Sequence, residues 1–233
     1  MPVPEEFPVA RRWAVGALLS MTFASGLVDA VSYLRLGSVF VVNMTGNVVF
    51  LGLSVSKAYH LSVVGPVVAL TAFVLGTFAG GRLNRYFGER PGPWLAGAFA
   101  GQAAVLALTA VLVGTGVLRA EGWATQLIVA LLGGCCGLQN ATVGLLAPRD
   151  LTTSVLTRTL TALTSQSALG AGTGAPPHRR AGSVLAVLAG AAVGGLLLQV
   201  TLAGVIGLAA VVVAGAAAVF VLAPRPRPAA TPD

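Results

Sequence analysis

With 56% hydrophobic and only 9% charged residues among 233, the chain lies far from the composition of a soluble domain, in which about a quarter of residues are charged. The net charge of +7 does not indicate nucleic-acid binding, because Lys57 and most of the arginines lie at the ends of the chain or in short loops between apolar runs, without a basic tract or interleaved aromatic residues. Continuous rather than alternating runs also argue against a membrane β-barrel. The composition therefore predicts a single all-α, polytopic helical membrane domain over residues 1–233.

Eight apolar segments follow one another along the chain. Prolines mark several borders, such as Pro148 after the fifth segment and Pro176 and Pro177 between the sixth and the seventh. The first segment is too long for a signal peptide, and no clear cleavage site follows it. The proline-rich tail 224–233 is expected to be disordered. The eight segments are Trp13–Leu34, Ser38–Ser56, Leu61–Gly81, Pro93–Val117, Trp123–Ala147, Leu151–Ala171, Ser183–Leu202 and Gly204–Leu222.

The second and sixth segments are too polar for helices that face lipid. The second contains the run Asn43–Asn47, and the sixth contains many serines and threonines together with Arg158. An arginine at the centre of a spanning helix costs about a few kcal/mol or more. Polar, broken or re-entrant helices are tolerated where protein or a cavity surrounds them. We therefore expect each of these two segments to be re-entrant or broken.

The basic residues distinguish two topologies. If all eight segments crossed with the N-terminus inside, eight lysines and arginines would lie inside and five outside. If the second and sixth segments return to the side from which they enter, eleven lie inside and three outside. The positive-inside rule favours this second topology, with six transmembrane helices and both termini in the cytoplasm. Trp13, Trp94 and Trp123 fall at segment ends, as interfacial anchors do.

The chain also contains a repeated helical unit. Three landmarks of the first half recur in the same order in the second half, at offsets of 111, 112 and 114 residues. With three crossings in each half, about 13–117 and about 123–222, the second half enters the membrane upside down, as in the inverted repeats of secondary transporters. The alternative is low-complexity sequence that matches itself by chance. The landmark pairs are Gly26–Ala30 with Gly137–Ala141, Asn43–Asn47 with the weaker Val155–Thr159, and Gly76–Leu83 with Gly190–Leu197.

Asp29 is the only acidic residue inside an apolar segment, and an ionisable group at such a depth is a functional candidate. It could couple protons or bind a cation; the alternative is a structural cap or an ion pair with Arg158 or Arg35. We expect it to face the protein interior and to contact the polar run of the second or sixth segment. Its repeat counterpart is Asn140, which is nearly isosteric but cannot titrate.

Further candidates lie in the polar segments. Asn43, Thr45 and Asn47 surround a flexible glycine, where a half-helix could offer its terminus and backbone groups to a substrate. Thr157 and Arg158 stand at the corresponding place in the second half. The arginine could bind an anionic substrate, pair with the carboxylate of the first half, or snorkel to the interface. The alternative for the polar residues is adhesion between helices through Asn and Thr hydrogen bonds.

Other conspicuous residues indicate packing rather than chemistry. Glycines spaced four apart from Gly76 and from Gly190 form small-residue faces that bring helices together. Cys135 and Cys136 are adjacent inside an apolar run, and the two histidines are isolated in loops, so we expect no metal site. The chain has no Walker loop, HExxH, GxSxG or catalytic carboxylate pair. We therefore expect neither an enzyme nor a cofactor.

Three runs carry a resemblance to a known family. The 30 residues 25–54 (SGLVDAVSYLRLGSVFVVNMTGNVVFLGLS), the run GLQNATVGLL at 137–146 and the threonine-rich sixth segment resemble the YoaK-like bacterial membrane proteins, a family defined by a domain of unknown function. The resemblance extends from about Trp13 to Leu222 and implies a six-helix integral membrane protein. It implies no substrate or activity. Arg158 stands where the family's second half usually has glycine, so a symmetric site is not expected.

These observations predict a multi-pass protein of the bacterial inner membrane that acts as a secondary transporter or facilitator of a small solute. The alternative is a scaffold or accessory subunit of the membrane, in which the same polar residues only join helices. The expected partners are the lipid bilayer and the solute, without nucleic acid, and a homo-oligomer is compatible with the sequence. The candidate site residues are Asp29, Asn43, Thr45, Asn47, Asn140, Thr157 and Arg158.

Overall fold

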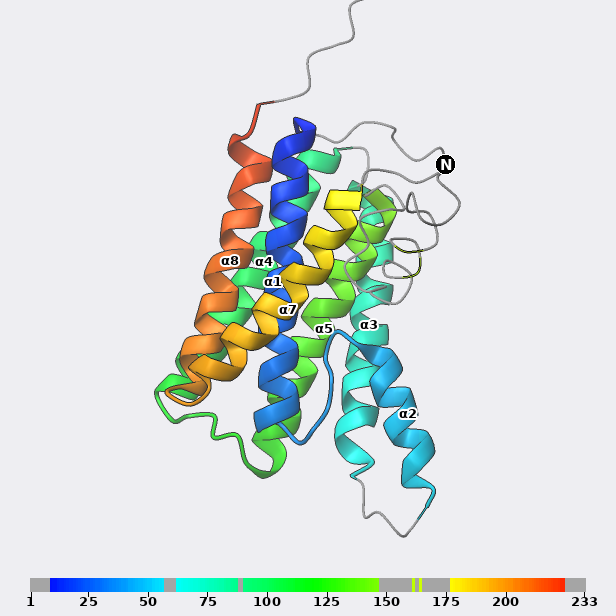
Figure 1. Cartoon of the computed structure of the whole chain (residues 1–233), viewed down its shortest axis with the longest axis vertical. Helices are drawn as coiled ribbons and strands as arrows, with labels where there is room; N and C mark the ends of the chain where they lie inside the picture. The colour runs from blue at the N-terminus through cyan, green and yellow to red at the C-terminus, as the bar shows by residue number, and fades with distance from the viewer. Residues whose placement is uncertain are drawn as a thin grey trace, which may run out of the picture.

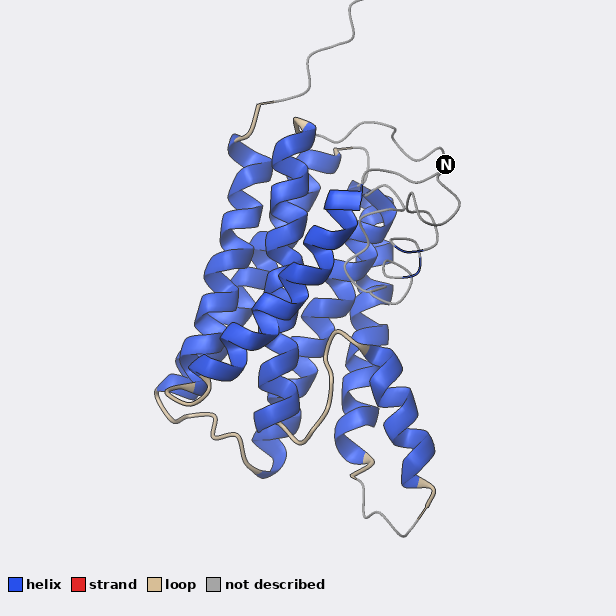
Figure 2. Cartoon of the chain, in the orientation of Figure 1, coloured by secondary structure: helices blue, strands red, loops and turns tan. Residues whose placement is uncertain are grey.

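The computed structural model describes residues 9–56, 62–87, 90–146, 161, 164 and 177–224. Over these residues the regular secondary structure is helical, with no strand (Figure 2). The helices are labelled in Figure 1 and comprise α1 (Arg11–Arg35), α2 (Met44–Ser54), α3 (Val64–Phe87), α4 (Pro91–Gly114), α5 (Gly122–Leu146), α7 (Pro177–Leu197) and α8 (Leu202–Leu222).

Length separates α2 from the other helices. The other six have 21 to 25 residues, which at 1.5 Å per residue gives about 31–38 Å, enough to cross a bilayer. Five of them, all except α7, are also apolar enough over their described length, and in α7 the apolar part is Ala181–Leu197. By contrast, α2 has 11 residues and is too short to span. The prediction of a polytopic helical membrane protein is thus confirmed.

The second apolar segment turns back on itself. The sequence predicts one segment over Ser38–Ser56, but the helix occupies only Met44–Ser54. The chain leaves α1 through Gly37 and Ser38, which have φ of 94° and 56°, and runs back along the bundle without helical structure before α2 begins (Figure 1). The segment therefore enters and leaves the bundle at the same end, as expected of a re-entrant segment. The sixth predicted segment, Leu151–Ala171, lies outside the described residues apart from two threonines.

α1 and α7 form a parallel pair with a close crossing (Figure 1). Gly26 lies against Gly190, and further along both helices Ala30 lies against Gly194. A side chain at Gly190 would collide with the backbone carbonyl oxygen of Phe23. Glycine is thus required here because the two backbones approach each other directly, as in other membrane helix pairs.

α3 and α5 form a second parallel pair, built in the same way. A side chain at Gly76 would collide with the carbonyl oxygen of Gly134, and a Cβ at Gly80 would lie 2.9 Å from that of Ala141. Both contacts have counterparts in the α1–α7 crossing, displaced by 114 residues in one helix and by 111 in the other. The repeated glycine runs of the sequence therefore lie at two equivalent helix crossings.

α4 and α8 form the third pair and run antiparallel. Phe99 near the start of α4 packs on Phe220 near the end of α8, with ring centroids 5.7 Å apart. At the same end of the bundle, the N–H of Ala10 before α1 donates to the carbonyl oxygen of Pro224 after α8, at 3.0 Å. This hydrogen bond ties the first helix to the last.

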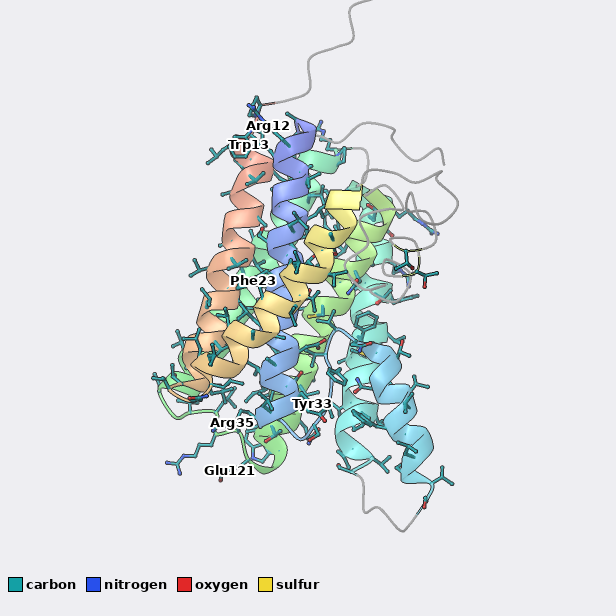
Figure 3. The ribbon with its side chains drawn as sticks, viewed as in Figure 1. Arg12, Trp13, Phe23, Tyr33, Arg35 and Glu121 are labelled. Carbon is teal, nitrogen blue, oxygen red and sulfur yellow. The ribbon has the colours of Figure 1, made fainter. Side chains whose placement is uncertain are left out.

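The described arginines are concentrated at one end of the bundle. This arginine-rich end, at the top of Figure 1, holds the starts of α1, α4 and α7 and the ends of α3, α5 and α8. Figure 3 shows Arg12 there, whereas Arg35 and Glu121 lie at the opposite end. The distribution is the one that the topology with six crossing helices requires. The described arginine side chains at the arginine-rich end are Arg12, Arg82, Arg85 and Arg90; those at the opposite end are Arg35 and Arg119.

Candidate functional site

Asp29 anchors the non-helical segment that precedes α2. It lies on α1, six residues before that helix ends, and its Oδ1 accepts hydrogen bonds from the N–H groups of Val41 (3.0 Å) and Val42 (2.9 Å). Without these bonds the two N–H groups would lack an acceptor inside the protein, where an unsatisfied group costs several kcal/mol. A carboxylate suits this position because it only accepts hydrogen bonds.

Asn47 holds the same segment from the side of α2. Its Oδ1 accepts a hydrogen bond from the N–H of Phe40 (2.9 Å), and its Nδ2 donates to the carbonyl oxygen of Phe40. The ring of Phe40 stacks on Tyr33 of α1 and on Phe50 of α2, with centroid distances of 5.1 and 6.0 Å. A Cβ at Gly46 would lie 2.6 Å from this ring. The Thr-Gly-Asn run of the sequence is thereby explained, because glycine leaves room for the ring and asparagine binds the backbone beside it.

The side chains of Asn43 and Thr45 are not part of this hydrogen-bonded cluster. Both side chains are exposed, and Asn43 occupies the N-cap position of α2 without a side-chain bond to the helix. Of the four candidate residues in the first half, Asp29 and Asn47 therefore bind the same non-helical segment, one from α1 and the other from α2. The other two lie at the start of α2 with their side chains outside that cluster.

Asp29 also interacts with a third backbone group of the segment. The side chain is partly buried, and the N–H of Asn43 donates to the same carboxylate, next to those of Val41 and Val42. Arg35, a partner considered from the sequence, instead donates from Nη1 to the carbonyl oxygen of Leu198, at 3.5 Å, near the end of α7. Asp29 thus binds three successive backbone N–H groups and forms no ion pair with the arginine side chains that the structure describes.

Asn140 has the equivalent position in the second half. It lies on α5, six residues before that helix ends, and its Nδ2 donates to the carbonyl oxygen of Cys136 (2.9 Å). Cys136 is buried and lies within electrostatic range of Asp29, where α1 and α5 meet. Asp29 and Asn140 therefore flank one central region of the bundle. Thr157 and Arg158 lie outside the described residues, and their roles stay predictions.

Comparison with known proteins identifies the family. A family model described as "Protein of unknown function (DUF1275)" matches residues 17–219. The chain belongs to the DUF1275 family. It is also 45% identical over 60 residues to the UPF0700 transmembrane protein YoaK of Bacillus subtilis (strain 168), a stretch that covers 26% of each chain. The resemblance to YoaK-like membrane proteins is thereby confirmed, and no solved structure matches the chain.

This DUF1275 protein contains a second buried polar contact, which the sequence reasoning missed. Nε2 of Gln102 on α4 donates to Oε1 of Gln139 on α5, at 2.7 Å, and both side chains are buried. Oε1 of Gln102 is buried without a hydrogen-bond partner in the described part of the chain. The signal was present in the repeat, because Gln139 occupies the position that Val28 has in the first half. In two runs that otherwise match, the second half has a polar residue where the first half has an apolar one. This difference indicates a contact specific to the second half.

Proposed function

We propose that this DUF1275 protein is a secondary transporter or facilitator that carries a small solute across the bacterial inner membrane. The observation that carries the proposal is Asp29, a carboxylate within a transmembrane bundle that holds a non-helical segment through hydrogen bonds to its backbone. Ionisable groups at this depth are costly and are found mainly on ion or substrate pathways. Non-helical backbone at this depth occurs where it is buried in protein or lines a cavity.

The helix crossings support an architecture of two inverted repeats. The α1–α7 and α3–α5 crossings use counterpart residues, and α1 and α5 run in opposite directions (Figure 1). In transporters with inverted repeats, the substrate site lies between the repeats, which rock against each other. In this protein that region lies between Asp29 and Asn140. Thr157 and Arg158 complete the proposed site from the second half.

The proposed mechanism couples occupancy of the site to the position of the re-entrant segment. A proton or cation on the Asp29 carboxylate withdraws negative charge from its oxygens, which weakens the bonds to Val41 and Val42. The segment before α2 is then held less tightly on α1. Asn43 and Thr45, exposed at the start of α2, line the path that this movement opens.

The proposed orientation places the arginine-rich end and both termini in the cytoplasm. Single cysteines at positions 85 and 119 test it, in a background in which Cys135 and Cys136 are replaced by serine. A membrane-impermeant maleimide added to intact cells should label Arg119→Cys and leave Arg85→Cys unlabelled until the membrane is opened. Labelling of position 85 from outside would contradict the orientation.

Growth and uptake of a deletion strain test the transport function. The strain is profiled on a broad panel of single solutes, with plasmids that encode the wild type, Asp29→Asn, or Gly97→Ala as a control at a position with open space around it. We expect one class of solute whose uptake the wild type and the control restore, and Asp29→Asn does not, at equal membrane abundance. If no solute separates the wild type from the empty plasmid, the transport function is rejected.

A specific observation favours the alternative of a membrane scaffold or accessory subunit. The bonds of Asp29 and Asn47 to the backbone of residues 40–42 stabilise the fold whether or not a solute passes. On this alternative, Asp29→Asn changes only abundance in the membrane, and a partner protein co-purifies with the wild type. Neither function assigns enzymatic chemistry to the chain.

A further inference from the structure

A cavity lies at the arginine-rich end, apart from the candidate transport residues. Its volume is about 540 Å³, and it lies where α3 ends and α4 begins. We call it the α3–α4 pocket. The residues that line it are Tyr86, Phe87, Arg90, Pro93 and Trp94.

Three features of the α3–α4 pocket favour a negatively charged group. Arg90 is exposed, and no carboxylate among the described residues pairs with it. It is also the N-cap of α4, a helix of 24 residues whose dipole is positive at this end, where Pro91 and Pro93 leave Gly92 as the one N–H donor of the first three residues. Finally, Nε1 of Trp94 is buried without an acceptor in the described part of the chain, although an indole N–H can only donate. A cation, a helix start and an unsatisfied donor thus lie together at one cavity.

The walls of the α3–α4 pocket require an apolar part in the same ligand. Tyr86 and Phe87 are 72% and 55% exposed, although both are large aromatic residues. Phe87 stacks on Trp94, with ring centroids 5.7 Å apart, so one aromatic wall runs from α3 to α4. A cavity of this volume lies in the range that holds whole organic ligands. An inorganic anion would fill little of it and would leave the rings uncovered.

Position in the membrane identifies the source of such a ligand. Tryptophan and tyrosine at the ends of transmembrane helices lie at the level of the lipid headgroups. Arg82 and Arg85, in the last turns of α3, add positive charge at the same end, and such charge attracts anionic lipid. A phospholipid presents a phosphate and an apolar glycerol-acyl region together at this depth.

We propose that the α3–α4 pocket binds the headgroup of an anionic phospholipid in the leaflet at the arginine-rich end. The Arg90 guanidinium pairs with the phosphate oxygens, and Trp94 Nε1–H donates to one of them. Tyr86, Phe87 and Pro93 cover the glycerol and the first acyl carbons. The bound lipid thus contacts both the end of α3 and the start of α4.

Native mass spectrometry of the purified full chain, titrated with phosphatidylglycerol in detergent, tests the proposal. Arg90→Gln should weaken the apparent affinity for the first bound lipid about tenfold, because a charge-assisted hydrogen bond is lost. Trp94→Phe keeps the stacked ring and removes only the N–H, and it should weaken the affinity about threefold. Phosphatidylcholine should bind more weakly than phosphatidylglycerol to the wild type, because its choline cation offsets the charge of the phosphate that Arg90 contacts.

Arg119→Gln is the matched control, because Arg119 is an exposed arginine at the opposite end. It should leave phosphatidylglycerol binding unchanged, and all three variants should keep the wild-type melting temperature in lipid-free detergent. Equal losses in Arg90→Gln and Arg119→Gln would mean diffuse attraction to charge, which overturns the proposal. Unchanged binding in Arg90→Gln would also overturn it, and displacement of the lipid by millimolar inorganic phosphate would reject a lipid as the ligand.

Discussion

The two halves of this protein are alike at their glycine crossings but differ at the matching polar positions, Asp29 and Asn140. At the crossings, α1–α7 and α3–α5 repeat the same backbone approaches with counterpart residues. At the polar positions, Asp29 binds the backbone of a separate segment, whereas Asn140 donates to the carbonyl oxygen of Cys136 in the preceding turn of its own helix. Architecture is therefore shared between the halves, while charge belongs to one of them.

This difference follows from what each position must satisfy. A close backbone crossing admits only residues without a side chain, so both halves need glycine. A polar position admits any group that satisfies the neighbouring donors and acceptors, so carboxylate and carboxamide can replace each other when those neighbours change. The comparison predicts that substitutions at the crossings have equal effects in the two halves, and that substitutions at the polar positions do not.

The largest effect is expected at the crossings. Gly190→Leu and Gly76→Leu each force a side chain into a backbone carbonyl and should lower the free energy of unfolding by about 3 kcal/mol. Unfolding by SDS in mixed micelles measures this value. Gly97→Leu is the control, since a Cβ at Gly97 has open space around it and should cost little. A large loss in one crossing without a similar loss in the other would break the equivalence of the halves.

The next effect is expected at Asp29. Asp29→Ala leaves the N–H groups of Val41 and Val42 without an acceptor and should destabilise the protein by about 2–3 kcal/mol, since each orphaned group costs about 1–3 kcal/mol. Asp29→Asn keeps one acceptor oxygen and should cost less than half as much. The same SDS titration compares the two variants. Equal stability of the alanine variant and the wild type would show that the carboxylate does not hold the re-entrant segment.

A somewhat smaller effect is expected at Asn47. Asn47→Leu removes both side-chain bonds to Phe40 and should cost about 2 kcal/mol. Because the segment then loses one of its two anchors, hydrogen exchange of residues 39–43 should accelerate more than exchange in α4. Thr45→Val is the control, because Thr45 is exposed outside the cluster. Unchanged exchange in the leucine variant would place the anchor elsewhere.

The smallest effect is expected at the glutamine pair. Gln102→Leu leaves Gln139 without its buried partner and should cost about 1 kcal/mol. The double variant with Gln139→Leu should recover much of this loss, because two apolar groups replace a bonded polar pair. A double-mutant cycle in the SDS titration gives the coupling energy. Additive losses would mean that the two amides do not depend on each other.

The sequence predicts the helices and the glycine faces well because both depend on side-chain type. Hydropathy locates α1, α3, α4, α5 and α8, and the repeat offsets match the two crossings. The sequence predicts a re-entrant or broken segment over Ser38–Ser56 but does not show where its helix begins. Ser38–Asn43 is apolar enough to resemble helix, while its backbone is held by other residues. The hydropathy of a segment does not show which groups form hydrogen bonds with its backbone.

The candidate site was less predictable for the same reason. The sequence predicts contact between Asp29 and the polar run of the second or sixth segment. The contact is made at the start of the second segment's run, through the backbone N–H groups of Val41, Val42 and Asn43, which leave no trace in residue type. The partner of Gln139 is Gln102, 37 residues earlier, and nothing in their spacing pairs them. A buried contact between two helices depends on how the helices rotate against each other, which the pattern of one helix does not fix.

The hydrogen bond between Ala10 and Pro224 has a consequence for chain connectivity. Since the first and last helices meet at the arginine-rich end, a short linker can join them there, and the chain can be opened instead between α4 and α5, at residues 115–121. The order of the two halves along the polypeptide would then be reversed without moving a helix. The fold therefore does not depend on which of these two connections carries the chain termini. A circular permutant that inserts and folds would demonstrate this.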